Sequence, residues 1–218
     1  MLPAQLVVGL MWFVVLLFSL SFHEASHAWM ARRIGDHTAE HEGRITLNPL
    51  AHIDPLGTVV LPLIQFFTGA ALIGWAKPTP YNPGNFNRNV SLARGHVLVA
   101  VAGPLSNMIL ALGFTAILFV MVRVFGVSGQ DSAPRMLLDL GISTNVALGI
   151  FNLIPIPPLD GSKVASWGLP RSLGEAYDRV FEPLGQWLLL LLVMTRVLGW
   201  IMRPIIDVVL NFLYAVIG

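Results

Sequence analysis

The sequence predicts an all-α polytopic membrane protein with about four to six membrane segments. Only 11% of its 218 residues are charged and 55% are hydrophobic, whereas a soluble domain carries about 25% charged residues. The mean hydropathy of +0.72 agrees with this composition. Long uncharged runs supply helices of about 20 residues, the length that crosses a hydrocarbon core of roughly 30 Å.

Charge and cysteine counts exclude several other classes. The chain has 13 basic and 12 acidic residues, so a nucleic-acid-binding protein with a broad basic face is not expected. It has no cysteine, which excludes disulfides, iron–sulfur clusters and any zinc site built from thiolates. A zinc site in this chain must use histidine and carboxylate ligands.

The first three spans follow from uncharged runs. Residues 1–26 are uncharged apart from Glu24, and the lack of a basic leader indicates a retained helix rather than a cleaved signal peptide. The runs 95–122 and 140–159 predict two further spans.

The C-terminal part is predicted to form a helical hairpin, or one span plus a surface helix. Its two uncharged runs, 183–195 and 208–218, are short. Arg196, Arg203 and Pro204 are expected to interrupt the apolar pattern between them.

The run 55–76 is predicted to dip into the membrane and return. The basic residues fall into three clusters: Arg32, Arg33 and Arg44; Lys77, Arg88 and Arg94; and Lys163, Arg171 and Arg179. The positive-inside rule places all three clusters in the cytoplasm, so this run begins and ends on one side. It is too short for two crossings, and Pro55, Gly57 and Pro62 are expected to break it. Residues 42–50 alternate modestly and predict a small β-hairpin.

The first apolar segment ends with His23-Glu24-Ala25-Ser26-His27. Histidines four residues apart lie on one face of a helix, which suits two ligands of one Zn²⁺. Glu24 lies beside the first ligand, where it can act as general base on a metal-bound water. The alternative is a set of polar residues reaching from a helix end to the interface. Ionisable groups at membrane depth are costly and usually functional, which favours the metal site.

Asp160 is the best candidate for a third zinc ligand. Catalytic zinc takes three protein ligands and a water, and the segment 152–161, NLIPIPPLDG, places Asp160 directly after the apolar run. Its three prolines break the helix, so the chain is expected to be extended at Asp160. The alternative is an ordinary span end followed by an Asp-Gly turn.

The paired motifs HEASH and NLIPIPPLDG resemble those of the site-2 proteases, which are intramembrane zinc metalloproteases. Gly103-Pro-Leu-Ser-Asn107 is similar to the family's Gly-x-x-x-Asn signature. Further similarity covers 43–49 and the region through Pro78, so the resemblance spans roughly residues 20–165. The chain is similar to the compact short form of the family, without PDZ or CBS domains.

The resemblance implies one Zn²⁺ per chain, held by His23, His27 and Asp160, with Glu24 activating the zinc-bound water. It also implies that Asn152 holds the scissile carbonyl or its oxyanion, a role that a side-chain amide donor suits. Asn152 as a cap of broken helix backbone stays open as the alternative.

On the helix between the two ligand segments, Asn107 is expected to bond between helices, while Gly103 lets two helices approach closely.

The implied activity is hydrolysis of peptide bonds within or near transmembrane segments. The catalytic core is expected to be 1–165, followed by a C-terminal loop and helical hairpin, 166–218, in a single membrane domain. The expected partners are a transmembrane or signal-peptide-like substrate and the lipid bilayer, without nucleic acid; homo-oligomerisation stays open. The expected location is the cell membrane of a prokaryote, with the active site towards the cytoplasm.

Two alternatives to this activity remain. A membrane zinc peptidase that clears remnant signal peptides would need the same site. A metal-ion transporter would need further acids or histidines along its helices, whereas the run 95–122 has only His96 and 140–159 has none.

Overall fold

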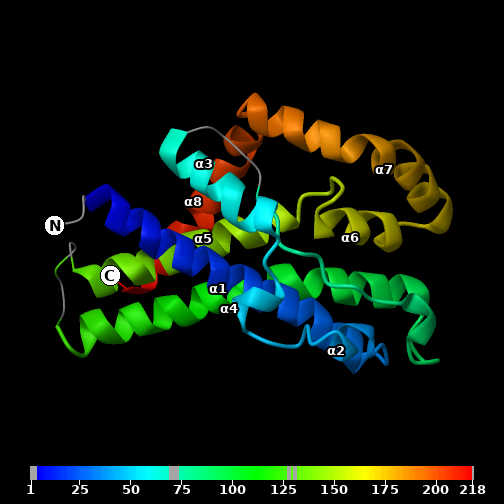
Figure 1. Ribbon diagram of the computed structural model, residues 1–218, viewed down its shortest axis with the longest axis horizontal. Helices are drawn as coiled ribbons and strands as arrows, with labels where there is room; N and C mark the ends of the chain where they lie inside the picture. Colours follow the sequence, from blue (N-terminus) through cyan, green and yellow to red (C-terminus); the bar gives the residue numbers. More distant parts are fainter. Residues whose placement is uncertain (1–3, 69–73, 127–128, 130–131, 218) are drawn as a thin grey trace.

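Helices make up all the regular structure of the residues that are described. The computed structural model describes residues 4–68, 74–126, 129 and 132–217 (Figure 1). Three helices are long and apolar enough to cross a membrane: α1 (Ala4–Arg33), α4 (Leu92–Arg123) and α8 (Val197–Ile217). The predicted all-α membrane class is therefore confirmed, while the number of crossings stays a prediction.

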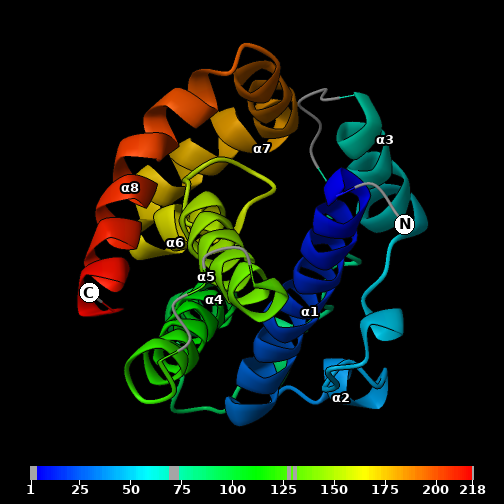
Figure 2. The same ribbon diagram turned by 90° about the vertical axis from the view of Figure 1, so that its left-hand side faces the viewer.

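The centre of the molecule is formed by α1, α4 and α5 (Ala133–Asn152), which pack against one another. Figure 2 shows α6 (Asp160–Gly168), α7 (Arg171–Met194) and α8 on one side of this centre, with α2 (Thr38–His41) and α3 (Leu61–Thr68) beyond α1 on the other. One apolar core lies between α4, α5 and α8: Ala111, Leu118, Leu138, Ile142, Val146, Leu213 and Ile217.

The C-terminal part consists of α7 and α8, which are joined at Thr195 and Arg196 and pack against each other. Whether both helices or α8 alone cross the membrane stays a prediction. Pro204 was expected to interrupt the second helix, but α8 continues through it. A proline in a helix removes one backbone hydrogen bond. Buried Met202 and Leu213 pack α8 onto its neighbours on both sides of Pro204, and this packing explains why the helix persists.

The end of α1 is tied to the loop before α4 by Asp36, which is fully buried. Its carboxylate accepts hydrogen bonds from the Thr38 amide and hydroxyl, the Asn82 amide and the Asn85 side chain, at 2.6–3.1 Å. Burial alone would raise the pKa of Asp36, but the hydrogen bonds from Thr38, Asn85 and Asn82 hold it below its ordinary value. This carboxylate also fixes the short helix η3 (Pro83–Asn85) beside α1.

The β-hairpin predicted for 42–50 is not formed, because this stretch contains no strand. It consists of a turn at Gly43, an extended stretch and the start of η1 (Pro49–Ala51). A side chain holds the stretch in place of strand pairing: the buried Arg44 guanidinium donates to the carbonyls of Ala51 and Pro78. Alternation in sequence predicts which residues share a face, but it does not supply a neighbouring strand.

The segment 55–76 begins as a helix rather than as broken backbone. Pro55 starts η2 (Pro55–Val60), where the Asp54 side chain accepts from the amides of Leu56 and Gly57, and α3 follows directly. At 1.5 Å per residue the two helices extend at most about 21 Å, less than the roughly 30 Å of a hydrocarbon core. Part of the segment, 69–73, lies outside the described residues, and the re-entrant path stays a prediction.

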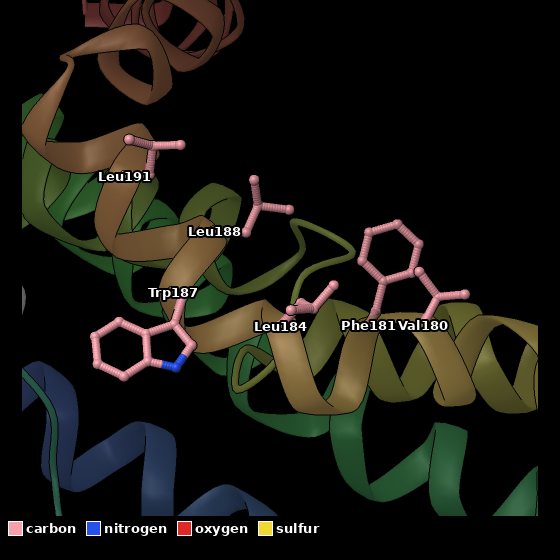
Figure 3. Close-up of a pocket in the computed structure, with 6 residues that line it drawn as sticks. All are labelled: Val180, Phe181, Leu184, Trp187, Leu188 and Leu191. Atoms are coloured by element: carbon pink, nitrogen blue, oxygen red, sulfur yellow. The ribbon is translucent and has the colours of Figure 1, made fainter.

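The outer face of α7 carries a shallow apolar groove (Figure 3). Its lining side chains come from one stretch of this helix: Val180, Phe181, Leu184, Trp187, Leu188 and Leu191. None of them is a predicted ligand or catalytic residue.

Candidate metal centre

Two buried histidines on α1 point their ring nitrogens in the same direction. His23 and His27 are one helical turn apart and only 4% and 8% exposed. The Nδ1 atom of His27 lies 2.7 Å from the Val99 carbonyl oxygen, and that of His23 lies 2.6 Å from Asn107 Oδ1. A carbonyl oxygen can only accept, so the His27 Nδ1 carries the hydrogen and its Nε2 is left as a lone-pair donor.

Asp160 belongs to α6, which packs against α4 as α1 does. α5 ends at Asn152, and seven irregular residues lead to Asp160, the first residue of α6. The prolines thus end the helix as predicted, but Asp160 begins a new helix rather than lying in extended chain. Gly161 allows this close turn, because a Cβ there would overlap the backbone of Leu153.

The three predicted ligands meet at one point. The two Nε2 atoms of His23 and His27 are 3.0 Å apart, and they lie 3.1 and 3.3 Å from Asp160 Oδ2. Ligands about 2.0–2.1 Å from a tetrahedral zinc would be about 3.3–3.4 Å apart. The Asp160 oxygen is buried without a hydrogen-bond donor. Converging acceptor atoms without a proton between them repel one another, so this donor set fits a bound cation.

The floor of this cluster is the backbone of α4 at Gly103. A Cβ built on Gly103 would overlap the imidazole rings of both His23 and His27. The glycine predicted to allow close helix packing therefore makes room for the metal ligands themselves.

Glu24 is held by a residue that the sequence did not single out. Its Oε2 accepts hydrogen bonds from the Thr79 backbone amide at 2.9 Å and from the Thr79 hydroxyl at 2.8 Å. Thr79 lies between Pro78 and Pro80, which have no amide hydrogen. The sequence shows that Thr79 carries a lone backbone amide between two prolines. It does not show that Glu24 is the acceptor, because that contact depends on the fold.

α6 is fixed beside the centre by stacked rings. Trp167, two turns after Asp160, stacks on His96 of α4 with ring centroids 4.2 Å apart and planes 11° apart. The Tyr81 hydroxyl lies 2.9 Å from His96 Nδ1. Burial and, to a smaller extent, the Asp160 carboxylate raise the pKa of Tyr81.

The described hydrogen bond of Asn152 lies within its own helix. Its side-chain amide donates to the Leu148 carbonyl, one turn back in α5, at 3.0 Å. Its described hydrogen bonds reach none of the three ligand residues, so its catalytic role stays a prediction.

Asn107 does bond between helices, as expected, and its partners include two residues that the sequence did not reveal. Its amide donates to Asn145 Oδ1 at 2.9 Å, and the Asn145 amide donates to Ser19 Oγ at 2.9 Å and to the Gly141 carbonyl at 2.8 Å. Ser19, Asn107 and Asn145 are fully buried. The sequence shows that Ser19 and Asn145 are polar residues in apolar segments. It does not show their hydrogen-bond partners, because these lie on other helices.

Comparison with known proteins identifies similar chains. The profile of "Peptidase family M50" matches residues 121–195, a range that includes Asp160. YwhC of Bacillus subtilis is 34% identical over 89% of this chain and 84% of that protein. Rip2 of Mycolicibacterium smegmatis is 31% identical over 90% of this chain and 70% of that protein. MJ0611 of Methanocaldococcus jannaschii is 31% identical over 67% of this chain and 64% of that protein.

All three of these relatives carry names that describe zinc metalloproteases. No solved structure matches the chain significantly.

Proposed function

The chain belongs to peptidase family M50, the site-2 proteases, and from this premise we propose that it is an intramembrane endopeptidase. It would cleave peptide bonds within or near transmembrane segments of other proteins. Zinc is the cofactor of this family. The observation that carries the proposal is the convergence, at 3.0–3.3 Å, of His23 and His27 of the candidate span α1 with Asp160 at the start of α6.

In this proposal His23, His27 and Asp160 hold the metal. When bound, zinc supplies Lewis-acid polarisation of the peptide carbonyl and acidifies a water molecule. Two imidazoles and one carboxylate would make up the three protein ligands that a catalytic zinc takes. Gly103 leaves room for the two imidazole rings, which a Cβ at this position would overlap.

Glu24 is the proposed general base. It takes a proton from the attacking water and passes it to the leaving amine. The Thr79 amide and hydroxyl both donate to Oε2, and the hydroxyl also lies 3.0 Å from the Glu24 backbone carbonyl oxygen. Neither donor reaches the other carboxylate oxygen, so we assign the proton transfer to Oε1. Thr79 thereby fixes the rotation of the carboxylate and leaves one oxygen for the reaction.

We place the site near the cytoplasmic end of α1. His27 and His23 precede Arg33 by six and ten residues, or about 9 and 15 Å along a helix. Arg32 and Arg33 at this end favour the cytoplasmic side, and Lys163 follows Asp160 closely. The substrate is then a transmembrane or signal-peptide-like segment whose scissile bond has left its helix, because a helical carbonyl is hydrogen-bonded.

A metal-ion transporter is the alternative from another class. It would need ligand groups spaced along a pathway. In the part of the chain that the structure describes, one group of three His, Asp or Glu side chains could hold a metal, and it is the cluster above. The other buried polar residues of α1, α4 and α5 are amides and hydroxyls, while buried Asp36, Arg44 and His52 lie outside these helices. The described membrane-type helices therefore carry no second row of buried ligand groups, which favours the peptidase.

The test combines zinc content with cleavage of quenched fluorescent single-span peptides in proteoliposomes. We expect about one zinc per chain in the wild type and in Glu24→Gln, and loss of zinc in His23→Ala and Asp160→Ala. Cleavage should be lost in all three variants. His41→Ala is the matched control, because this histidine is exposed and outside the cluster. Retention of zinc by both ligand variants, or full cleavage by Glu24→Gln, would refute the proposal.

A further inference from the structure

A chain of direct hydrogen bonds leads from His23, away from the metal centre, into α5. His23 Nδ1 meets Asn107 Oδ1 at 2.6 Å, and Asn107 Nδ2 meets Asn145 Oδ1 at 2.9 Å. Asn145 Nδ2 then meets the Gly141 carbonyl oxygen at 2.8 Å. The two asparagines are fully buried, so water does not compete for any of these contacts.

The direction of this chain follows from its last member. An amide oxygen and nitrogen are assigned from their partners, and a backbone carbonyl can only accept. The Gly141 carbonyl therefore requires the nitrogen of Asn145, so the oxygen of Asn145 faces Asn107. Asn107 must present its own nitrogen there and its oxygen to His23. The Ser19 carbonyl, 3.5 Å from Asn107 Nδ2, is compatible with the same orientation, but at this distance the contact is too weak to fix it.

This direction decides which nitrogen of His23 carries the hydrogen. The oxygen of Asn107 accepts, so His23 Nδ1 donates and its Nε2 keeps a lone pair directed at His27 and Asp160. The reverse orientation of Asn107 would donate to Nδ1 and put the hydrogen on Nε2, where it would block metal binding. His27 is held in the same tautomer directly, because its Nδ1 donates to the Val99 carbonyl.

We propose that Asn145, acting through Asn107, is a positioning residue that holds His23 in its metal-binding tautomer. The Gly141 carbonyl sets the direction, and the two side chains transmit it from α5 across α4 to α1. This inference rests on the proposed metal site. A hydrogen-bond partner behind a histidine ligand fixes its tautomer and orientation, and its loss lowers metal affinity about 10–100-fold.

Ser19 provides a matched control within the same cluster. Its hydroxyl accepts from Asn145 at 2.9 Å, but a hydroxyl can accept or donate and so specifies no direction. Ser19→Ala removes a buried polar group and leaves the Gly141 contact in place. We expect zinc affinity close to that of the wild type.

The experiment measures zinc affinity by competition with a chromophoric chelator on the purified, folded protein. Asn145→Leu should weaken zinc binding about tenfold, because Asn107 is then free to turn its nitrogen towards His23. Adding Asn107→Asp to Asn145→Leu should restore affinity, since a carboxylate can only accept from Nδ1. Thermal unfolding of the metal-free variants reports folding separately, and Asn145→Ala takes the place of Asn145→Leu if the latter does not fold.

Ring ¹⁵N shifts of histidine-labelled, metal-free protein report the tautomer itself. We expect the Nδ1–H form of His23 in the wild type and in Ser19→Ala, and a mixture in Asn145→Leu. Wild-type affinity in Asn145→Leu, or no gain from Asn107→Asp, would overturn the inference and leave the metal site standing. If His23→Ala bound zinc as tightly as the wild type, the metal site would fall as well.

Discussion

At the scale of single residues, Thr79 orients the carboxylate of the proposed base, Glu24. Thr79→Val keeps the backbone amide that donates to Glu24 Oε2 and removes the hydroxyl that donates at 2.8 Å. A hydrogen bond to a charged group contributes about 1.5–3 kcal/mol, and about 1.4 kcal/mol is tenfold in rate. We expect kcat to fall about tenfold or more with KM and zinc content unchanged.

Thr115→Val is the control for this variant, because it removes a buried hydroxyl from α4 that bonds only within its own helix. It should leave kcat unchanged. A wild-type kcat in Thr79→Val would show that the carboxylate does not depend on this hydroxyl.

Gly103 gives a second prediction at the scale of one residue. In Gly103→Ala the new methyl group would overlap both histidine rings, and overpacking of this kind costs about 1–3 kcal/mol. We expect zinc content to drop sharply, as measured by metal analysis of the purified protein. Gly113→Ala on the same helix, where a Cβ meets nothing within 4 Å, should keep its zinc. Full zinc occupancy in Gly103→Ala would contradict this account of the site floor.

The sequence predicts these site residues unevenly, for a physical reason. His23 and His27 are predictable because helical periodicity alone puts positions four apart on one face. Asp160 could be predicted only from a second motif. That motif supplied a carboxylate directly after a proline-broken helix. Thr79 and Asn145 were not predictable, because each acts through a partner on another element, and the sequence does not state which helices face each other.

Elements differ in the same way. Long apolar runs predict α1 and α4 well, since hydropathy is a property of the segment itself. The prediction of a hairpin at 42–50 was wrong because a strand forms only with a neighbouring strand. Arg44 instead holds this stretch by donating hydrogen bonds to the carbonyls of Ala51 and Pro78. The continuation of α8 through Pro204 was missed because the packing of α8 on its neighbours is not visible in its own residues.

The connection between α1 and the loop before α4 gives a prediction at the scale of elements. Asp36 accepts four hydrogen bonds there, and Asp36→Asn replaces one acceptor oxygen with a donor that faces other donors. Leaving buried groups unsatisfied costs about 1–3 kcal/mol. We expect a lower thermal midpoint at pH 7, whereas Glu175→Gln, on an exposed pair, should change it little.

The effect of Asp36→Asn should also depend on pH. The pKa of Asp36 is lowered by folding, so its ionised form stabilises the protein above the unfolded-state pKa of about 3.9. That stabilisation is lost as pH falls through the folded-state pKa. The difference in midpoint between wild type and Asp36→Asn should therefore shrink in strong acid. A difference that stayed constant or grew as pH fell would contradict this linkage.

At the scale of the whole molecule, the end of α1, the start of α4 and α6 lie close together. Asp36 ties the end of α1 to the loop that starts α4, and α6 packs against the same part of α4. α4 has 32 residues, or about 48 Å, which exceeds a hydrocarbon core of roughly 30 Å. We therefore expect its two ends to lie on opposite sides of the membrane. If α4 crosses in this way, we expect the ends of α1 and α6 to share one side of the membrane with the metal centre, and the end of α4 at Arg123 to lie on the other.

This arrangement can be tested with single cysteines, because the natural chain has none. His41→Cys, exposed just after α1, and Phe125→Cys, 73% exposed just after α4, report on the two sides. The basic residues around the α1 end favour the cytoplasm. We therefore expect a membrane-impermeant maleimide to label Phe125→Cys in intact cells and His41→Cys only after permeabilisation. Labelling of both from outside would contradict the crossing by α4, and the reverse pattern would place the metal centre towards the outer face.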